Sequence, residues 1–166
     1  MTNESRRAAI VLTADQVADK RMAFSHPWGR DSKLTGTWLS RETGMTGTGV
    51  GLITVPPGHE SFARHAHLHE DEWVYILSGK GLALLGAREV EVGPGDFIAM
   101  PAPQEPHVLR NPFEVDLTYL TGGMSAPLDV IDFPEAGKRM TRVGPNFEVV
   151  PLDAVAPMDW TKAFEQ

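Results

Sequence analysis

The sequence predicts an all-β protein built as an antiparallel sandwich or barrel. Its 166 residues suit one domain with a proper hydrophobic core and are too few for two domains of ordinary size. Runs of β-forming residues are short and numerous, and Gly and Pro turns separate them at close intervals. We therefore expect a single barrel with appendages.

One short helix is expected before the sheet begins. Thr13 stands three positions before Gln16, which is the spacing of a capping box, and the predicted helix covers residues 13–20. The first strands are predicted at residues 35–39 and 50–55. The glycine-rich stretch between them has no following Lys and precedes no helix, so we interpret it as a hairpin turn and not as a phosphate-binding loop.

The middle of the chain predicts most of the sheet. Further strands are expected at residues 73–77, 82–85, 89–92, 96–100 and 115–120, the last of which closes the sheet. Beyond Gly123 the sequence is mixed and punctuated by Pro, and residues 159–165 are expected to form a short helix. We expect this tail to wrap around the barrel or around a partner subunit.

The most informative segment is residues 65–79, which reads HAHLHEDEWVYILSG. Successive side chains of a strand point to opposite faces, so His65 and His67 share a face and aim their rings at a common point, as a divalent cation requires. Residues 68–71 are turn-like, so we expect Glu72 to open the returning strand of a β-hairpin beside the two imidazoles. A further ligand must come from farther along, and the only downstream histidine is His107.

The spacing of these residues resembles the first motif of the cupin superfamily. That motif is a glycine, His-x-His, three or four residues, Glu, six residues and Gly, and it appears here as His65, His67, Glu72 and Gly79. The glycine before it, Gly58, is separated from His65 by six residues rather than five, which affects only the entering loop.

The second cupin motif is also present. It consists of a Pro-x-Gly turn, a strand, and a His with an Asn four positions later, and it corresponds here to residues 93–95, His107 and Asn111. The proline stands directly before Gly95 instead of two positions before it, and this variation leaves His107 in place.

The resemblance implies an antiparallel jelly-roll (cupin) barrel with short N-terminal and C-terminal extensions that are helical or irregular. We place the barrel at residues 35–123, the N-terminal extension at 1–34 and the C-terminal extension at 124–166. The resemblance also implies one divalent metal ion held by His65, His67, Glu72 and His107. Because the chain has no Cys, its ligands are nitrogen and oxygen, which suit Mn, Fe, Ni, Co or Zn. The alternative is a relic barrel that no longer binds metal.

Other titratable residues receive weaker interpretations. His69 is interpreted as a rim or turn residue, with a proton shuttle as the alternative, and His26 and His59 as surface residues. The inner lining is expected to be largely apolar: Val74 and Ile76 share the face of Glu72, and Phe97, Ala99 or Met100 form the opposite wall. No catalytic base is secure, and the candidates are His69, Glu60 and Glu105, each expected to be an ordinary rim residue.

Composition excludes several classes of partner. The formal net charge of −7 and the pI near 5.3 argue against a nucleic-acid surface, which needs a basic stripe. No segment approaches the apolar length of a membrane span, and the N-terminal apolar run is too short for a signal peptide, so we expect a soluble cytoplasmic protein. We also expect a small-molecule substrate and a homodimer. Trp73 and Tyr75 on the outer face are available for dimer packing, with an intrachain layer as the alternative.

Three functions are open. The chain is similar to single-domain bacterial cupins often labelled sugar-phosphate isomerases, in which the second motif is followed by segments matching residues 119–120, 122–123 and 129–134. The first hypothesis is therefore a metal-dependent enzyme on a small oxygenated metabolite, an isomerase working through a metal-bound enediolate. The second is an iron-dependent dioxygenase, and the third is a binding module that holds a small molecule without turnover.

Overall fold

The computed structural model describes residues 11–156, which begin with the predicted helix. Helix α1 (Ala14–Asp19) is closed at its start by Thr13. The Gln16 N–H donates to the Thr13 hydroxyl, and the Thr13 N–H donates to the Gln16 side chain, so the predicted capping box is confirmed. The two bonds satisfy amide groups that a helix start would leave unpaired.

Within residues 11–156 the strands form three antiparallel sheets, and the predicted jelly-roll class is confirmed. The largest sheet has the order β1 (Met22–Phe24), β2 (Leu34–Thr37), β3 (Thr48–Val55), β11 (Leu117–Met124), β6 (Glu72–Ser78) and β9 (Phe97–Met100). The second has the order β4 (His59–Glu60), β10 (His107–Asn111), β7 (Gly81–Leu85) and β8 (Arg88–Val92). The third has the order β14 (Asn146–Pro151), β13 (Lys138–Val143), β12 (Leu128–Phe133) and β5 (Ala66–His67).

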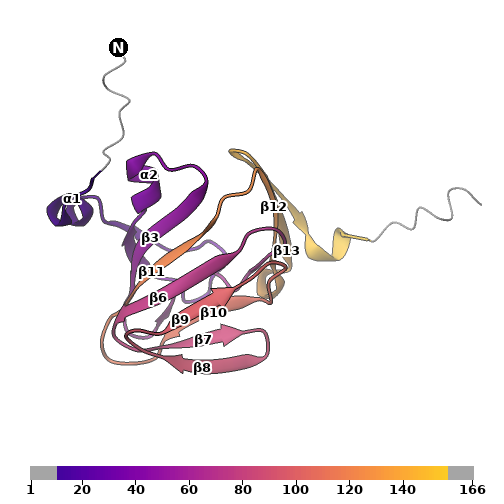
Figure 1. Ribbon diagram of the computed structural model, residues 1–166. Coiled ribbons are helices and arrows are strands. Elements are labelled where there is room, and N and C mark those ends of the chain that lie inside the picture. Colours follow the sequence, from indigo (N-terminus) through magenta and orange to yellow (C-terminus); the bar gives the residue numbers. More distant parts are fainter. Residues whose placement is uncertain (1–10, 157–166) are drawn as a thin grey trace, which may run out of the picture.

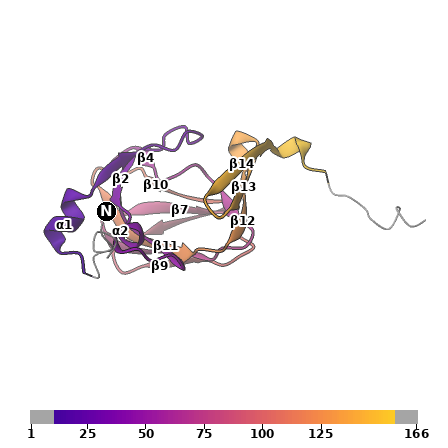
Figure 2. The same cartoon turned by 90° about the horizontal axis from the view of Figure 1, so that it is seen from above.

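The sheets enclose one main core, with the third sheet at an end of the barrel. In Figures 1 and 2 α1 lies at one end of the molecule and β12 and β13 at the opposite end. Strand β6 shows the alternation that builds the core: Val74 and Ile76 are buried, whereas Tyr75 and Leu77 are exposed. Each fully buried aliphatic side chain of this kind contributes roughly 1.5–3 kcal/mol to folding. The inward face of β6 is therefore fixed by its core residues, and Glu72 inherits that direction.

The connection between β2 and β3 differs from the predicted hairpin turn. The two strands do pair, with Thr35 opposite Thr54, but helix α2 (Leu39–Thr43) lies between them. It ends at Gly44, whose φ of 72° is left-handed and whose N–H donates to the Arg41 carbonyl. A glycine-rich segment was expected to be the turn, and its first glycine instead ends a helix.

The predicted hairpin between the histidine strand and the Glu72 strand is wrong. Strand β5 pairs with β12, and β6 pairs with β11 and β9. The turn-like residues 68–71 therefore carry the chain from one sheet to another. A local pattern predicts that the chain turns, but the partner of β5 lies more than 60 residues away and leaves no local signal.

The C-terminal extension also differs from the helical or irregular segment predicted. Residues 128–151 contain strands β12, β13 and β14, with short 3₁₀ helices η2 (Pro134–Ala136) and η3 (Leu152–Ala154) beside them. Along β12 the buried residues are Asp129, Ile131 and Phe133. Because one inward position is a carboxylate, the sequence lacks the regular apolar alternation that would predict a strand here. The helix expected at residues 159–165 lies outside the described residues, and the domain boundaries stay predictions.

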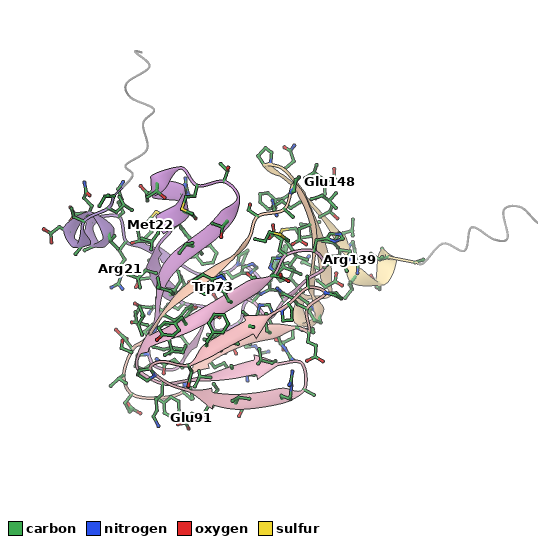
Figure 3. The ribbon with its side chains drawn as sticks, viewed as in Figure 1. Arg21, Met22, Trp73, Glu91, Arg139 and Glu148 are labelled. Carbon is green, nitrogen blue, oxygen red and sulfur yellow. The ribbon has the colours of Figure 1, made fainter. Side chains whose placement is uncertain are left out.

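The outer face of the large sheet carries exposed aromatic residues. Trp73, labelled in Figure 3, stacks on Phe97 at 6.2 Å between ring centroids, and Tyr75 is exposed on the same strand. On β9, Ile98 and Met100 face inward, whereas Phe97 and Ala99 face outward, so Met100 alone of the three residues expected there forms the inner wall. The homodimer stays a prediction. None of the helices in residues 11–156 combines the length and the apolar character that a bilayer crossing needs.

The two motif glycines Gly58 and Gly79 allow a matched test of packing. Their φ angles are 76° and 75°, but a Cβ on Gly79 would lie 2.1 Å from the Asp116 carbonyl oxygen, whereas a Cβ on Gly58 meets nothing within 4 Å. We expect Gly58→Ala to lower the free energy of unfolding by about 1–2 kcal/mol and Gly79→Ala by about 2–5 kcal/mol, because only the second adds a backbone clash. Urea denaturation measures both, and equal losses would show that the clash relaxes.

Candidate metal centre

A backbone bridge brings two of the histidines together. The His65 N–H donates to the His107 carbonyl at 3.1 Å, and the His107 N–H donates to the His65 carbonyl at 2.8 Å. The two ring centroids consequently lie 4.5 Å apart. His67 follows two positions later on the same face, with its ring centroid 5.0 Å from that of His65. The three imidazoles thus share one side of the barrel interior.

Glu72 reaches the same point from the opposite sheet. Its Oε2 lies 3.0 Å from Nε2 of His107, 3.5 Å from Nε2 of His67 and 3.7 Å from Nε2 of His65. The structure therefore brings together all four side chains that the sequence motifs single out. The ligand atoms of His65, His67 and Glu72 all lie within 4.8 Å of one another, and His107 adjoins this trio through its 3.0 Å approach to Glu72.

The other ring nitrogen of each histidine has an acceptor of its own. Nδ1–H donates to the Ala63 carbonyl in His65 and to the Glu105 carbonyl in His107. In His67 it donates to the Asp129 carboxylate. A neutral imidazole with its proton on Nδ1 presents a lone pair on Nε2, which is the form that binds a metal ion. In that form each of the three rings would offer its Nε2 lone pair to an ion held beside Glu72.

Electrostatics keep Glu72 ionised although it is largely buried. Burial by itself raises the pKa of Glu72, but hydrogen bonding and positive charge from the protonated rings of His107 and His65 outweigh it and hold that pKa well below its ordinary value. Burial lowers the pKa of His107 although the nearby Glu72 carboxylate acts to raise it. The net effect favours the neutral ring. Oε2 of Glu72 is buried without a well-aligned hydrogen bond. A buried anionic oxygen beside three imidazole nitrogens is an arrangement that a cation completes.

These residues fit a divalent ion. Three imidazole nitrogens and one carboxylate oxygen are donors that Mn, Fe, Co, Ni and Zn accept. The imidazoles are each oriented by a further hydrogen bond, as histidine ligands commonly are.

A second group of acidic residues, not predicted from the sequence, supports the first. Asp129 is fully buried on β12, and its other oxygen accepts the His69 N–H at 3.0 Å. Glu70 is also buried, accepts the Ala126 N–H and pairs with Arg142 from β13. In the sequence, Asp129 belongs to the segment 129–134 of the family likeness. The signal that could have singled it out is an acidic residue between two hydrophobic neighbours.

The other residues weighed from the sequence lie apart from the cluster. His69 is exposed, in keeping with a rim residue, while Glu60 pairs with Arg110 and Glu105 pairs with Arg88. The interpretation of His26 as a surface residue is wrong, because its ring lines the cavity beside the cluster and stacks on Phe133 at 5.3 Å. The His26 ring reaches the cavity because the N-terminal segment folds back across the barrel. No local sequence pattern predicts that long-range contact.

The cluster lies in the wall of a cavity of about 580 Å³. Most of the lining is aliphatic or aromatic, and the side chains come from all three sheets. A smaller cavity of about 310 Å³ shares Trp38, Glu72, Thr121 and Arg142 with it. A small ligand in the larger cavity would therefore contact the cluster directly.

An antiparallel jelly-roll barrel with His and Glu side chains converging in its interior defines the class of protein. Residues 51–122 match the family model of the cupin domain. The chain therefore carries a cupin domain, as the two sequence motifs predicted.

Two solved structures share this fold over most of the chain. One, from Acidithiobacillus ferrooxidans and named "Putative sugar phosphate isomerase", has 28% identity and a TM-score of 0.84, with 93% of this chain and 99% of that chain covered. The other, named a sugar phosphate isomerase from a cupin superfamily, from Silicibacter pomeroyi, has 23% identity and a TM-score of 0.77, with 89% and 96% covered. The second likeness shows the fold alone.

One curated relative is similar over a shorter segment. An uncharacterized protein of Methanocaldococcus jannaschii is 39% identical over 66 residues, which are 40% of this chain and 51% of that protein. The chain thus matches about half the length of this relative.

Asp129 offers a test of the cluster that leaves the four candidate ligands unchanged. We expect Asp129→Asn to lower the affinity for Zn²⁺ by about 10- to 100-fold, because His67 loses the carboxylate that orients its ring and fixes its proton. Competition with a chromogenic chelator measures the affinity. Asp132→Asn, which removes a carboxylate from the same strand but one paired with Arg139, is the matched control and should leave the affinity unchanged. Equal affinities for both variants would contradict the orienting role of Asp129.

Proposed function

We propose that the protein is a metal-dependent enzyme that acts on a small oxygenated metabolite, with isomerisation of a hydroxy-carbonyl compound as its reaction. The observation that carries this proposal is the convergence of three Nε2 atoms and the Glu72 carboxylate in the wall of a cavity of about 580 Å³. His65, His67, Glu72 and His107 would hold the ion. A bound divalent ion would supply Lewis acidity that polarises a substrate carbonyl.

The remaining lining supports chemistry on a desolvated substrate. Aliphatic and aromatic side chains exclude water from the cluster, which strengthens every electrostatic interaction within it. Nδ1 of His26 accepts the Trp28 N–H at 3.2 Å, so the neutral ring carries its proton on Nε2. Burial lowers the pKa of His26, which favours this neutral form. His26 can therefore donate a hydrogen bond that orients a substrate oxygen.

Isomerisation as the reaction is supported by the similar structures. The Acidithiobacillus protein, which is named for sugar phosphate isomerisation, is 28% identical over nearly the whole chain. The names of these proteins supply the reaction class for the first assay.

The assay uses metal-free protein reloaded with Mn²⁺, Fe²⁺, Co²⁺, Ni²⁺ or Zn²⁺. We expect at least one loaded form to exchange the carbon-bound proton of a hydroxy-ketone with deuterium from solvent, which NMR detects, across a panel of sugar phosphates and phosphate-free hydroxy-ketones. Glu72→Gln should lower metal affinity and turnover by at least ~100-fold, since a direct ligand should matter no less than the groups that orient ligands. Glu91→Gln is the control, because Glu91 is exposed on β8, at the lower edge of the molecule in Figure 3.

Binding of panel compounds without turnover by any loaded form would overturn the enzyme proposal and favour a binding module. Protein that keeps its metal after Glu72→Gln would overturn the assignment of Glu72 as a ligand.

A dioxygenase is the second candidate, and the apolar lining favours it. Oxidative cleavage of an enediol or a phenol requires an apolar cavity for substrate and oxygen, and it does not depend on a protein base at the substrate carbon. We expect Fe²⁺-loaded protein to consume dioxygen with such a substrate and Zn²⁺-loaded protein to consume none, because Zn²⁺ has no redox chemistry. An oxygen electrode separates this candidate from the isomerase, for which neither form would consume oxygen.

A further inference from the structure

We propose that the substrate has an apolar, planar body, such as an aromatic ring, attached to the oxygenated end that reaches the metal centre. This inference rests on the proposed function and narrows its substrate class. It separates this protein from enzymes whose substrates are sugar phosphates, which carry a hydroxyl on nearly every carbon and a dianionic phosphate.

The first observation is a set of aromatic side chains in the cavity lining, which we call the aromatic wall. The cavity is lined by Phe24, Trp38, Phe62, Phe133 and Phe147. The ring centroid of Phe62 lies 5.5 Å from that of Phe24 and 6.0 Å from that of Trp38. These separations are those of aromatic rings in contact, so one surface of the cavity offers ring faces and edges to a ligand.

The aromatic wall reaches the metal centre itself. Phe133 stacks on His65 with centroids 5.8 Å apart and planes inclined by 25°. A substrate whose oxygens approach His65 and Glu72 would thus have its next atoms against Phe133. The body of the substrate, and not only its far end, lies among apolar groups.

The second observation concerns the serine and threonine hydroxyls of the lining, because the His26 Nε2–H can serve only one substrate oxygen. The Ser61 hydroxyl accepts the Leu109 N–H at 3.2 Å, and the Thr121 hydroxyl donates to the Trp73 carbonyl at 3.3 Å. Both hydroxyls therefore already take part in hydrogen bonds within the protein. A buried sugar would leave several of its hydroxyls without partners, which binding strongly disfavours.

The cavity is equally unsuited to a phosphate dianion. Arg142 is the cationic side chain among the described lining residues, and it already pairs with Glu70. Buried Asp129 lies directly behind His67 and adds a second carboxylate on this side of the cavity. A phosphate would have to compete with Glu70 for the guanidinium in the neighbourhood of these carboxylates, where like charge repels it.

The mouth of the cavity has the same character. Phe147, on β14 beside the Glu148 labelled in Figure 3, is 59% exposed although it lines the cavity, and Phe24 is 37% exposed. Exposed aromatic side chains at the entrance of an aromatic cavity are suited to an apolar ligand. Their exposure also means that they can be replaced without opening the core.

The test uses three hydroxamates that share one metal-binding group and differ in the attached body. Benzohydroxamate carries a phenyl ring, acetohydroxamate a methyl group, and phosphoglycolohydroxamate a phosphate-bearing arm that mimics a sugar phosphate. Isothermal titration of the Zn²⁺-loaded protein gives each Kd. We expect benzohydroxamate to bind at least about tenfold more tightly than either of the others, because its ring packs against the aromatic wall.

Two matched variants locate the bound ring. Phe147→Ala should weaken benzohydroxamate about three- to tenfold and change acetohydroxamate less than twofold. Phe97→Ala removes a ring of similar exposure, 61% against 59%, from the outer face of the barrel and should leave all three Kd values unchanged.

Two results would overturn the substrate class alone, and a third would also overturn the proposed function. Tighter binding of phosphoglycolohydroxamate than of benzohydroxamate would overturn the substrate class and leave the metal-dependent function standing. Equal Kd values for the three compounds would do the same, because the metal alone would then provide the affinity. Failure of the protein to retain Zn²⁺, measured by elemental analysis before titration, would overturn the proposed function and this inference with it.

Discussion

The reciprocal hydrogen bonds between His65 and His107 are the constraint on which the site depends. They join a segment before β5, in the third sheet, to the first residue of β10, in the second sheet. Glu72 then enters from the first sheet, so all three sheets contribute to the point where the four side chains meet. Because each side chain is anchored by its own strand, a small displacement of any sheet would separate the donor atoms.

The buried carboxylates around this point differ in whether they have partners. Asp129 accepts from His67, and Glu70 is neutralised by Arg142, so both of these buried carboxylates have partners. The Glu72 oxygen nearest the histidines lacks a well-aligned one. A buried ionised group without a partner costs several kcal/mol unless a positive charge is supplied. The negative charge on Oε2 of Glu72 is therefore left without a partner in the folded chain, and a bound divalent ion would supply the missing positive charge.

The fold and the cavity bear on different parts of the function. The cupin domain and the similar structures identify the barrel, whereas the side chains beyond the candidate ligands decide what fits in the cavity. Here those side chains are mostly aromatic or aliphatic, and the Ser61 and Thr121 hydroxyls already bond within the protein. Proteins that share a barrel and a candidate ligand set can thus differ in what they bind through residues such as Phe62, Phe133 and Phe147.

The sequence by itself determined the capping box, most strand positions and the four residues that converge, because strand parity and motif spacing are local properties of the chain. Only the tertiary structure decided that β5 pairs with β12, that Asp129 stands behind His67, and that His26 joins the cavity wall. Each of these contacts joins segments about 40 to more than 60 residues apart. Local alternation of side chains does not predict such pairs, since their proximity arises from how the sheets close around the core.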